Sequence, residues 1–404
     1  MLVRNMTLLR AATALLPLLL PVTACGDDAP RRSDAAGGDT ALGDTGADAA
    51  ADAVAADTAQ ADTSATLCSP SDRAACLYRP SATYPFTTTR VDGLTYTDVT
   101  GATRNVNVAV YRPTGAPTPM PVVLLSHGGA DGKTNPLQSM EHWAPVFAAA
   151  GYLAVAIAHE GRDDASYEAL CAALEVSTAN PCGLKIGWDR PHDVDRVLTW
   201  LAEQAVTPPL AGQIDLDRIA HVGHSAGAGA AMMSVGATRN YVCGLPFGFE
   251  SDTQDCQVAD LVSLAKPEID VAVALSPQGP GSDGFMEESY ATVTRPMLMA
   301  TGANDGDEGE PASRVALWPL LAAGDKHKVY IDDPGAKHTL FEGDTQACVP
   351  LASENKCAAM RDSVFSAALA FVDAHLRASA AAAAWLASDQ LETAGGGIID
   401  LEHR

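Results

Sequence analysis

Ile219-Ala220-His221-Val222-Gly223-His224-Ser225-Ala226-Gly227 is the stretch that decides the fold, because a Gly-x-Ser-x-Gly pattern directly follows an apolar run. The small residues at 228–231 favour a helix after it. Strand, sharp turn and helix are the setting of a nucleophile elbow, in which the turn forces the serine into a strained backbone conformation. Glycines at 223 and 227 let strand and helix pack closely. The pattern predicts Ser225 at the tip of a sheet, where helix N–H groups favour negative charge.

The rest of the chain alternates strand and helix signals. Residues 94–99 and 106–111 alternate apolar and polar side chains and predict an antiparallel hairpin. Short apolar runs predict buried parallel strands at 121–126, 153–158, 271–275, 297–301 and 329–331. Helical patterns follow at 140–150, 191–205, 311–322 and 358–377. This alternation predicts an α/β fold with a mostly parallel sheet and helices on both faces.

The N-terminus has the pattern of an export signal. Residues 1–25 carry two arginines, a short Leu-rich apolar stretch and then Val22-Thr23-Ala24-Cys25, which resembles a bacterial lipobox. We expect cleavage before Cys25 and lipidation of that cysteine, so that the membrane is reached through the lipidated N-terminus only. Plain secretion with cleavage near Ala24 is the alternative. The chain is therefore predicted to lie in the bacterial cell envelope.

Three further segments follow the signal. Residues 26–66 are rich in Ala, Asp, Thr and Gly, show no hydrophobic period, and are expected to be a disordered linker. Residues 67–377 are predicted to form the catalytic domain. For the Ala-rich tail at 378–404 the sequence leaves two possibilities, an extension of the final helix or a frayed end.

Charge and cysteine content narrow the function further. With 50 acidic and 26 basic side chains the formal net charge is −24, which excludes nucleic acid as an expected partner. An exported chain meets an oxidising compartment, and eight cysteines remain after Cys25. They predict four local disulfides, namely Cys68–Cys76, Cys171–Cys182, Cys243–Cys256 and Cys348–Cys357. The sequence contains no Cys-x-x-Cys motif, and neither a metal nor a cofactor is expected.

Candidate catalytic residues lie after the predicted strands. A serine nucleophile needs a base, and the base needs an orienting carboxylate. Asp305 follows the strand at 297–301, and His338 follows the strand at 329–331. Ser225, Asp305 and His338 thus occur in the order Ser-Asp-His, with His338 as general base and acid. Asp307 and, more remotely, Asp283 are the alternative carboxylates.

The oxyanion hole requires two backbone donors. One is expected from Ala226, directly after the nucleophile, and the other from Gly129 in the loop after the strand at 121–126. Its neighbours Gly128 and Ala130 stay possible. Among the other histidines, His221 is interpreted as a core residue and His127 as a residue that shapes this loop.

Taken together these motifs resemble the α/β-hydrolase superfamily over about residues 90–377, most closely the dienelactone-hydrolase-like group with platelet-activating-factor acetylhydrolases and cutinase-like polyesterases. The resemblance is carried by Leu125-Ser126-His127-Gly128-Gly129, Ala150-Gly151-Tyr152-Leu153, Asp189-Arg190-Pro191-His192-Asp193-Val194, Gly223-His224-Ser225-Ala226-Gly227, Asn304-Asp305 and Gly335-Ala336-Lys337-His338. It implies the α/β-hydrolase fold and a serine hydrolase.

Two departures concern the substrate. Polyesterases of this group usually carry an aromatic residue where Gly129 stands and a tryptophan near residues 276–278, and neither is present. Dienelactone hydrolases proper use a cysteine nucleophile, whereas this chain has Ser225. The expected function is a lipid-anchored serine esterase that acts on a small-molecule or lipid-like ester. A peptidase or acyltransferase with the same triad, or a non-catalytic surface binding module, are the alternatives.

Overall fold

The computed structural model describes residues 68–129, 132–176, 185, 187–241, 258–307 and 309–404. The predicted signal, Cys25, the linker and the Cys243–Cys256 bond lie outside these residues. Within the described residues, one nine-stranded sheet has the order β1-β2-β4-β3-β5-β8-β9-β10-β11, and β6 and β7 form a separate two-stranded sheet. The strands are β1 (Phe86–Thr97), β2 (Thr103–Pro113), β3 (Met120–Ser126), β4 (Leu153–Ala158), β5 (Ile214–His224), β6 (Thr238–Asn240), β7 (Leu261–Ser263), β8 (Val271–Leu275), β9 (Met297–Gly302), β10 (Lys326–Ile331) and β11 (Ile399–His403).

The centre of the large sheet is parallel. Every neighbouring pair from β4 to β10 runs parallel, while β1 with β2, β2 with β4 and β10 with β11 are antiparallel. The predicted α/β architecture with a mostly parallel sheet is confirmed. The carboxyl ends of the parallel strands meet at one edge, which is where open sheets of this kind carry their functional loops.

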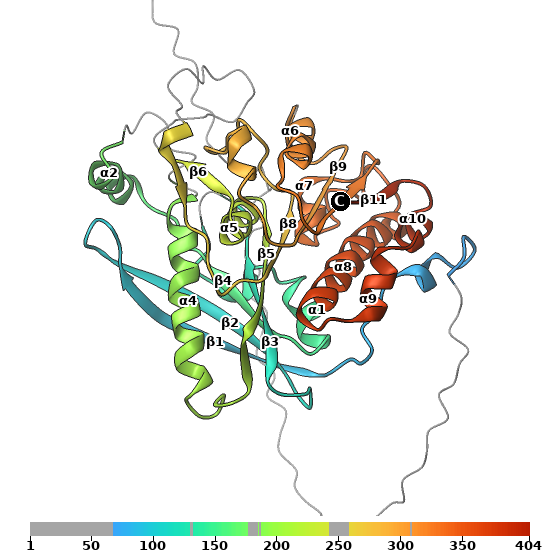
Figure 1. Ribbon diagram of the computed structural model, residues 1–404, viewed down its shortest axis with the longest axis horizontal. Coiled ribbons are helices and arrows are strands. Elements are labelled where there is room, and N and C mark those ends of the chain that lie inside the picture. The colour runs from blue at the N-terminus through green and yellow to red at the C-terminus, as the bar shows by residue number, and fades with distance from the viewer. Residues whose placement is uncertain (1–67, 130–131, 177–184, 186, 242–257, 308) are drawn as a thin grey trace, which may run out of the picture.

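Helices cover both faces of this sheet (Figure 1). The helices of the described residues are α1 (Ala144–Ala149), α2 (Asp164–Ala173), α4 (Asp189–Ala205), α5 (Ala226–Ser234), α6 (Glu310–Ala316), α7 (His338–Glu342), α8 (Glu354–Leu376), α9 (Ala380–Leu386) and α10 (Gln390–Gly395). On β3, Val123 and Leu125 pack into the core cluster that contains α1 and α8, whereas Val122 and Leu124 pack into the cluster that contains α4 and α5. Successive side chains of a strand point to opposite faces, so a continuous apolar run serves both cores.

All four predicted helices differ in their bounds from the observed ones. The helices expected at 191–205 and 358–377 begin earlier, at Asp189 and Glu354, and the other two are shorter than expected. The helix expected at 140–150 begins at Ala144, because Met140 has a left-handed backbone with φ of 51°. The helix expected at 311–322 ends at Ala316 and gives way to a short 3₁₀ turn at Trp318–Leu320. Pro319 lies in that turn and has no N–H to continue an α-helix. Among the helices described, none combines the length and apolar character that a membrane crossing requires.

Two of the predicted disulfides, Cys68–Cys76 and Cys348–Cys357, are confirmed. The predicted Cys171–Cys182 bond is wrong, because Cys171 is a free thiol that is 1% exposed. Its side chain lies on the inner face of α2 and packs into the apolar core that also contains Leu170. Close spacing in sequence suggested a pair, but the helix directs this sulfur inward. Cys182 itself lies outside the described residues.

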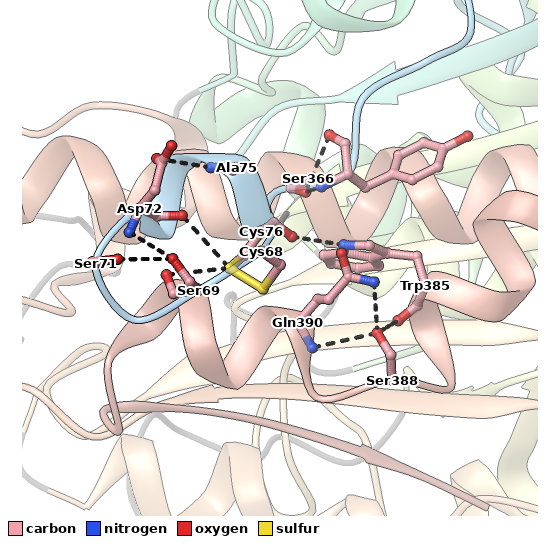
Figure 2. The surroundings of a disulfide bond; sticks show 11 residues. Cys68, Ser69, Ser71, Asp72, Ala75, Cys76, Ser366, Trp385, Ser388 and Gln390 are labelled. Atoms are coloured by element: carbon pink, nitrogen blue, oxygen red, sulfur yellow. Dashed lines mark hydrogen bonds between the residues drawn. A yellow bond between two sulfur atoms is a disulfide. The ribbon is translucent and has the colours of Figure 1, made fainter. Parts of the chain in front are cut away.

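The Ala-rich tail neither extends α8 nor frays. After α8 ends at Leu376, the chain forms α9 and α10 and returns as β11, which pairs antiparallel with β10. Trp385 of α9 is 5% exposed and donates its indole N–H to the main-chain oxygen of Cys76 at 2.8 Å. Figure 2 shows this contact beside the Cys68–Cys76 bond. The first and last segments of the described chain therefore pack against each other.

Replacing Trp385 tests whether the tail is part of the core. We expect Trp385→Ala to lower the free energy of unfolding by about 3–5 kcal/mol, because it leaves a cavity and an unpaired carbonyl. The exposed neighbour Ala384 is the matched control, and Ala384→Ser is expected to change it by less than about 0.5 kcal/mol. Urea unfolding followed by circular dichroism measures both. An equal free energy of unfolding for the two variants would mean that Trp385 does not contribute to the stability of the core.

Candidate active site

Ser225 lies at a strained turn between β5 and α5. Its backbone has φ of 52° and ψ of −119°, a conformation rare for residues other than glycine. A Cβ atom at Gly223 would lie 2.0 Å from the main-chain oxygen of Gly227, and one at Gly227 would lie 2.0 Å from that of Ser126. Both glycines are therefore required by close backbone approach. The turn leaves Ser225 partly exposed at the carboxyl edge of the sheet.

His338 and Asp305 form a direct pair. His338 is the first residue of α7, and its Nδ1 lies 2.7 Å from the Asp305 carboxylate. Their loops are brought together by a parallel bridge between Asn304 and Lys337. Nδ1–H donates to the carboxylate and fixes the imidazole tautomer, as the orienting acid of a triad does.

The surroundings of Asp305 keep it ionised. The side chain is fully buried, and burial alone raises a carboxyl pKa. The Arg314 guanidinium 3.5 Å away, the bond from His338 and a 2.8 Å bond from the Thr301 hydroxyl outweigh burial and lower the pKa of Asp305 below its usual value. Its alternatives are placed differently. Asp307 is exposed, and Asp283 is a buried residue whose main-chain oxygen accepts a hydrogen bond from Arg239.

His224 links the serine turn to the histidine. Its Nε2 donates to the main-chain oxygen of His338 at 3.0 Å, and the two rings are 4.6 Å apart. Because His224 directly precedes Ser225, this contact brings the Ser225 turn and α7 together. The sequence analysis gave His224 no role beyond its place in the Gly-x-Ser-x-Gly pattern. The only indication in the sequence was a histidine directly before Ser225.

Glu342 extends this contact on α7. Its carboxylate lies 3.9 Å from His224 Nδ1 and 3.1 Å from the Lys133 ammonium. Burial raises the pKa of Glu342, but electrostatic interactions with His224, Lys133 and His338 outweigh it and leave the pKa below its usual value. The loop that precedes α1 is thereby fastened to the helix that begins at His338.

The loop after β3 lies directly on the elbow. A Cβ atom at Gly128 would lie 3.0 Å from Ser225 Cβ and 2.7 Å from His224 Nδ1, so a side chain there would require the His224 ring to move. Gly129 has φ of 88° with open space around it. Ala226 is the first residue of α5. Ala226 thus directly follows Ser225, and Gly129 directly follows Gly128, which lies close to Ser225; Ala130 lies outside the described residues.

Behind this loop runs a line of buried hydrogen bonds that the sequence did not reveal. His159 Nδ1 lies 2.9 Å from the Asp193 carboxylate, and His159 Nε2 lies 2.8 Å from the Ser126 hydroxyl. The same hydroxyl is 2.8 Å from His221 Nε2, and His221 Nδ1 is 2.9 Å from the Ser234 hydroxyl. This Asp-His-Ser series has the spacing of a triad, but all its members are at most 1% exposed. Because they are buried, these residues are interpreted as structural, and their hydrogen bonds stabilise the end of β3.

One cavity of the described residues lies away from the carboxyl edge. That cavity has a volume of about 270 Å³ and is lined among others by Tyr84, Pro121 and Gly151. Pro121 and Gly151 lie at or before the starts of β3 and β4, at the opposite edge of the parallel strands. It does not contribute to the Ser225 site.

No metal centre is evident in the part of the chain described here, where no group of three or more His, Cys, Asp or Glu side chains is arranged to hold an ion. Comparison with models of known protein families and with curated proteins finds no match.

The buried histidines predict a pH dependence of stability. Burial, followed by the Lys266 charge, lowers the pKa of His221 from 6.5 to about 3. Between these pH values the unfolded chain binds a proton at His221 that the folded chain does not bind. The free energy of unfolding is therefore unaffected by His221 above pH 6.5 and decreases as the pH falls below that value. At pH 5 this effect lowers the free energy of unfolding by about 2 kcal/mol relative to neutral pH.

Glutamine does not titrate, so the unchanged protein should lose about 2 kcal/mol more free energy of unfolding than His221→Gln between pH 8 and pH 5. Urea unfolding at several pH values measures it. His142, which is 44% exposed on its side chain, is the matched control, and His142→Gln should follow the parent curve. Parallel curves for parent and His221→Gln would contradict the assignment of a neutral buried imidazole.

Proposed function

We propose that this chain is a serine hydrolase of the α/β-hydrolase type that cleaves carboxylic esters through Ser225, His338 and Asp305. The observation that carries the proposal is the 2.7 Å bond between His338 and Asp305 next to a strained serine turn whose residue 224 contacts His338. The three side chains follow β5, β9 and β10, whose carboxyl ends lie at one edge. The strand order and this placement support the superfamily resemblance.

In the proposed mechanism the Ser225 oxygen attacks the ester carbonyl carbon while its proton passes to His338 Nε2. The carbonyl electron pair moves onto oxygen, where the N–H groups of Ala226 and Gly129 hold the negative charge. The intermediate collapses as the C–O bond to the alcohol breaks, and the departing oxygen takes the proton from His338. Water then attacks the acyl-enzyme by the same route, releasing the acid and restoring Ser225. Asp305 keeps the histidine oriented and stabilises its cation.

Ser225→Ala is expected to lower kcat for p-nitrophenyl butyrate by about 10⁴-fold or more, because it removes the nucleophile. It should also abolish labelling by a fluorophosphonate probe. Unchanged turnover in a folded variant would refute the proposal. A parallel assay with a p-nitroanilide separates an esterase from a peptidase, since rapid amide cleavage would favour the latter.

The two loop carboxylates provide a matched pair for the same assay. Asp305→Asn is expected to lower kcat by about 10³–10⁴-fold, because an amide no longer selects the correct tautomer. Asp307→Asn, two residues away and exposed, should stay within about twofold. The opposite ranking would assign the orienting carboxylate to Asp307.

We further propose that the enzyme is exported to the bacterial cell envelope and anchored by lipid on Cys25. The lipobox-like Val22-Thr23-Ala24-Cys25 supports this proposal, and the two confirmed disulfides are compatible with an oxidising compartment. We expect mass spectrometry of the mature N-terminus to find acylated Cys25 and Cys25→Ala to release the chain from membranes. An unmodified N-terminus after Ala24 would instead indicate plain secretion.

A further inference from the structure

We propose that Arg190 is the positioning residue of the oxyanion loop, an inference that rests on the proposed serine hydrolase function. Arg190 is the second residue of α4 and is 3% exposed. Its Nη1 donates to the main-chain oxygen of His127 at 2.5 Å, and its Nη2 donates to that of Gly129 at 2.8 Å. One guanidinium thus holds two carbonyls of the loop that lies on Ser225.

The carbonyl between these two is held by His127. Its Nδ1 donates to the main-chain oxygen of Gly128 at 2.6 Å, while its Nε2 accepts the main-chain N–H of His159 at 3.0 Å. These two bonds require a neutral ring with its proton on Nδ1. Burial, followed by the Arg190 charge, lowers the pKa of His127 well below its usual value and keeps the ring neutral. Three consecutive carbonyls therefore have fixed donors.

Fixing these carbonyls also fixes the N–H groups. In a trans peptide unit the C=O and the N–H of the next residue point in opposite directions. The Gly128 carbonyl is held by His127, so the Gly129 N–H is turned to the opposite side. Arg190 holds the two flanking peptide units. It thereby limits rotation of the loop about its glycines, which have little intrinsic preference for one backbone conformation. The donor assigned to the oxyanion hole is thereby preorganised.

The fork of arginine suits this task. Its planar guanidinium reaches two acceptors at once, whereas a lysine ammonium is a point donor on a flexible stem. Burial lowers the pKa of Arg190 to about 9, which still leaves it charged at neutral pH. The carboxylates on the same helical turn are bound by other arginines, because Arg162 pairs with Asp189 and Arg104 with Asp193.

The test compares Arg190→Met and Arg190→Lys with Arg162→Met, which also removes a buried cation near the start of α4 but does not contact the loop carbonyls. Two readouts are used, the kinetics of p-nitrophenyl butyrate hydrolysis and the affinity of phenylboronic acid, which forms a tetrahedral adduct on a catalytic serine. We expect Arg190→Met to lower kcat by about 10- to 100-fold with KM within about threefold, and boronate affinity to fall by a similar factor. Arg190→Lys should be intermediate, and Arg162→Met should keep kcat within about threefold.

The outcomes separate the two proposals. A kcat within threefold of the parent for folded Arg190→Met, or an equal loss in Arg162→Met, overturns the positioning role. If Arg190→Met does not fold, Arg190→Lys decides, because unchanged kcat and boronate affinity in that variant overturn the role as well. A parent protein that neither hydrolyses the ester nor binds the boronate shows instead that the hydrolase proposal itself fails, and the role of Arg190 fails with it.

Discussion

The structure depends on backbone contact between three segments at the end of the sheet. The end of β3, the end of β5 and the first turn of α5 approach so closely that a single Cβ at Gly223 or Gly227 would overlap a main-chain oxygen. This contact forces Ser225 into its left-handed turn and places residue 128 on it. Because the contacts are between backbone atoms, they do not depend on side-chain rotamers. The site therefore inherits its geometry from the core of the fold.

The parts that sequence predicted well are the ones with local signals. The strands expected at 153–158 and 271–275 have those bounds, since a run of apolar side chains between turns is sufficient to indicate a buried strand. The course of the tail could not be predicted in this way. Its alanines indicate a helix, but the position of β11 depends on an open edge of β10 more than 60 residues earlier in the chain. Likewise, the spacing of Cys171 gave no information on which way its helix turns it.

The candidate site shows the same division. The Ser-Asp-His order could be predicted because each residue follows its own strand, but the choice between Asp305 and Asp307 depends on burial against Arg314 and Thr301. His224 and Arg190 were quoted in motifs without a role. Each acts through hydrogen bonds to main-chain oxygens in another segment, and no pattern of side chains in sequence reports such contacts.

The side of the loop on which Arg190 lies has an electrostatic consequence for the proposed mechanism. The main-chain oxygens of His127 and Gly129 point toward the buried cation, so these two peptide dipoles have their positive N–H ends on the far side of their peptide planes from Arg190. In the proposed mechanism the oxyanion forms on that far side. The charge and the dipoles therefore act in the same direction on a negative charge that develops there. In a buried setting such an aligned arrangement needs no reorganisation when the charge forms. Asp193 is bound by Arg104 and His159, which limits how far its charge opposes this field. In the proposed mechanism the Arg190 charge and these peptide dipoles therefore stabilise the same oxyanion.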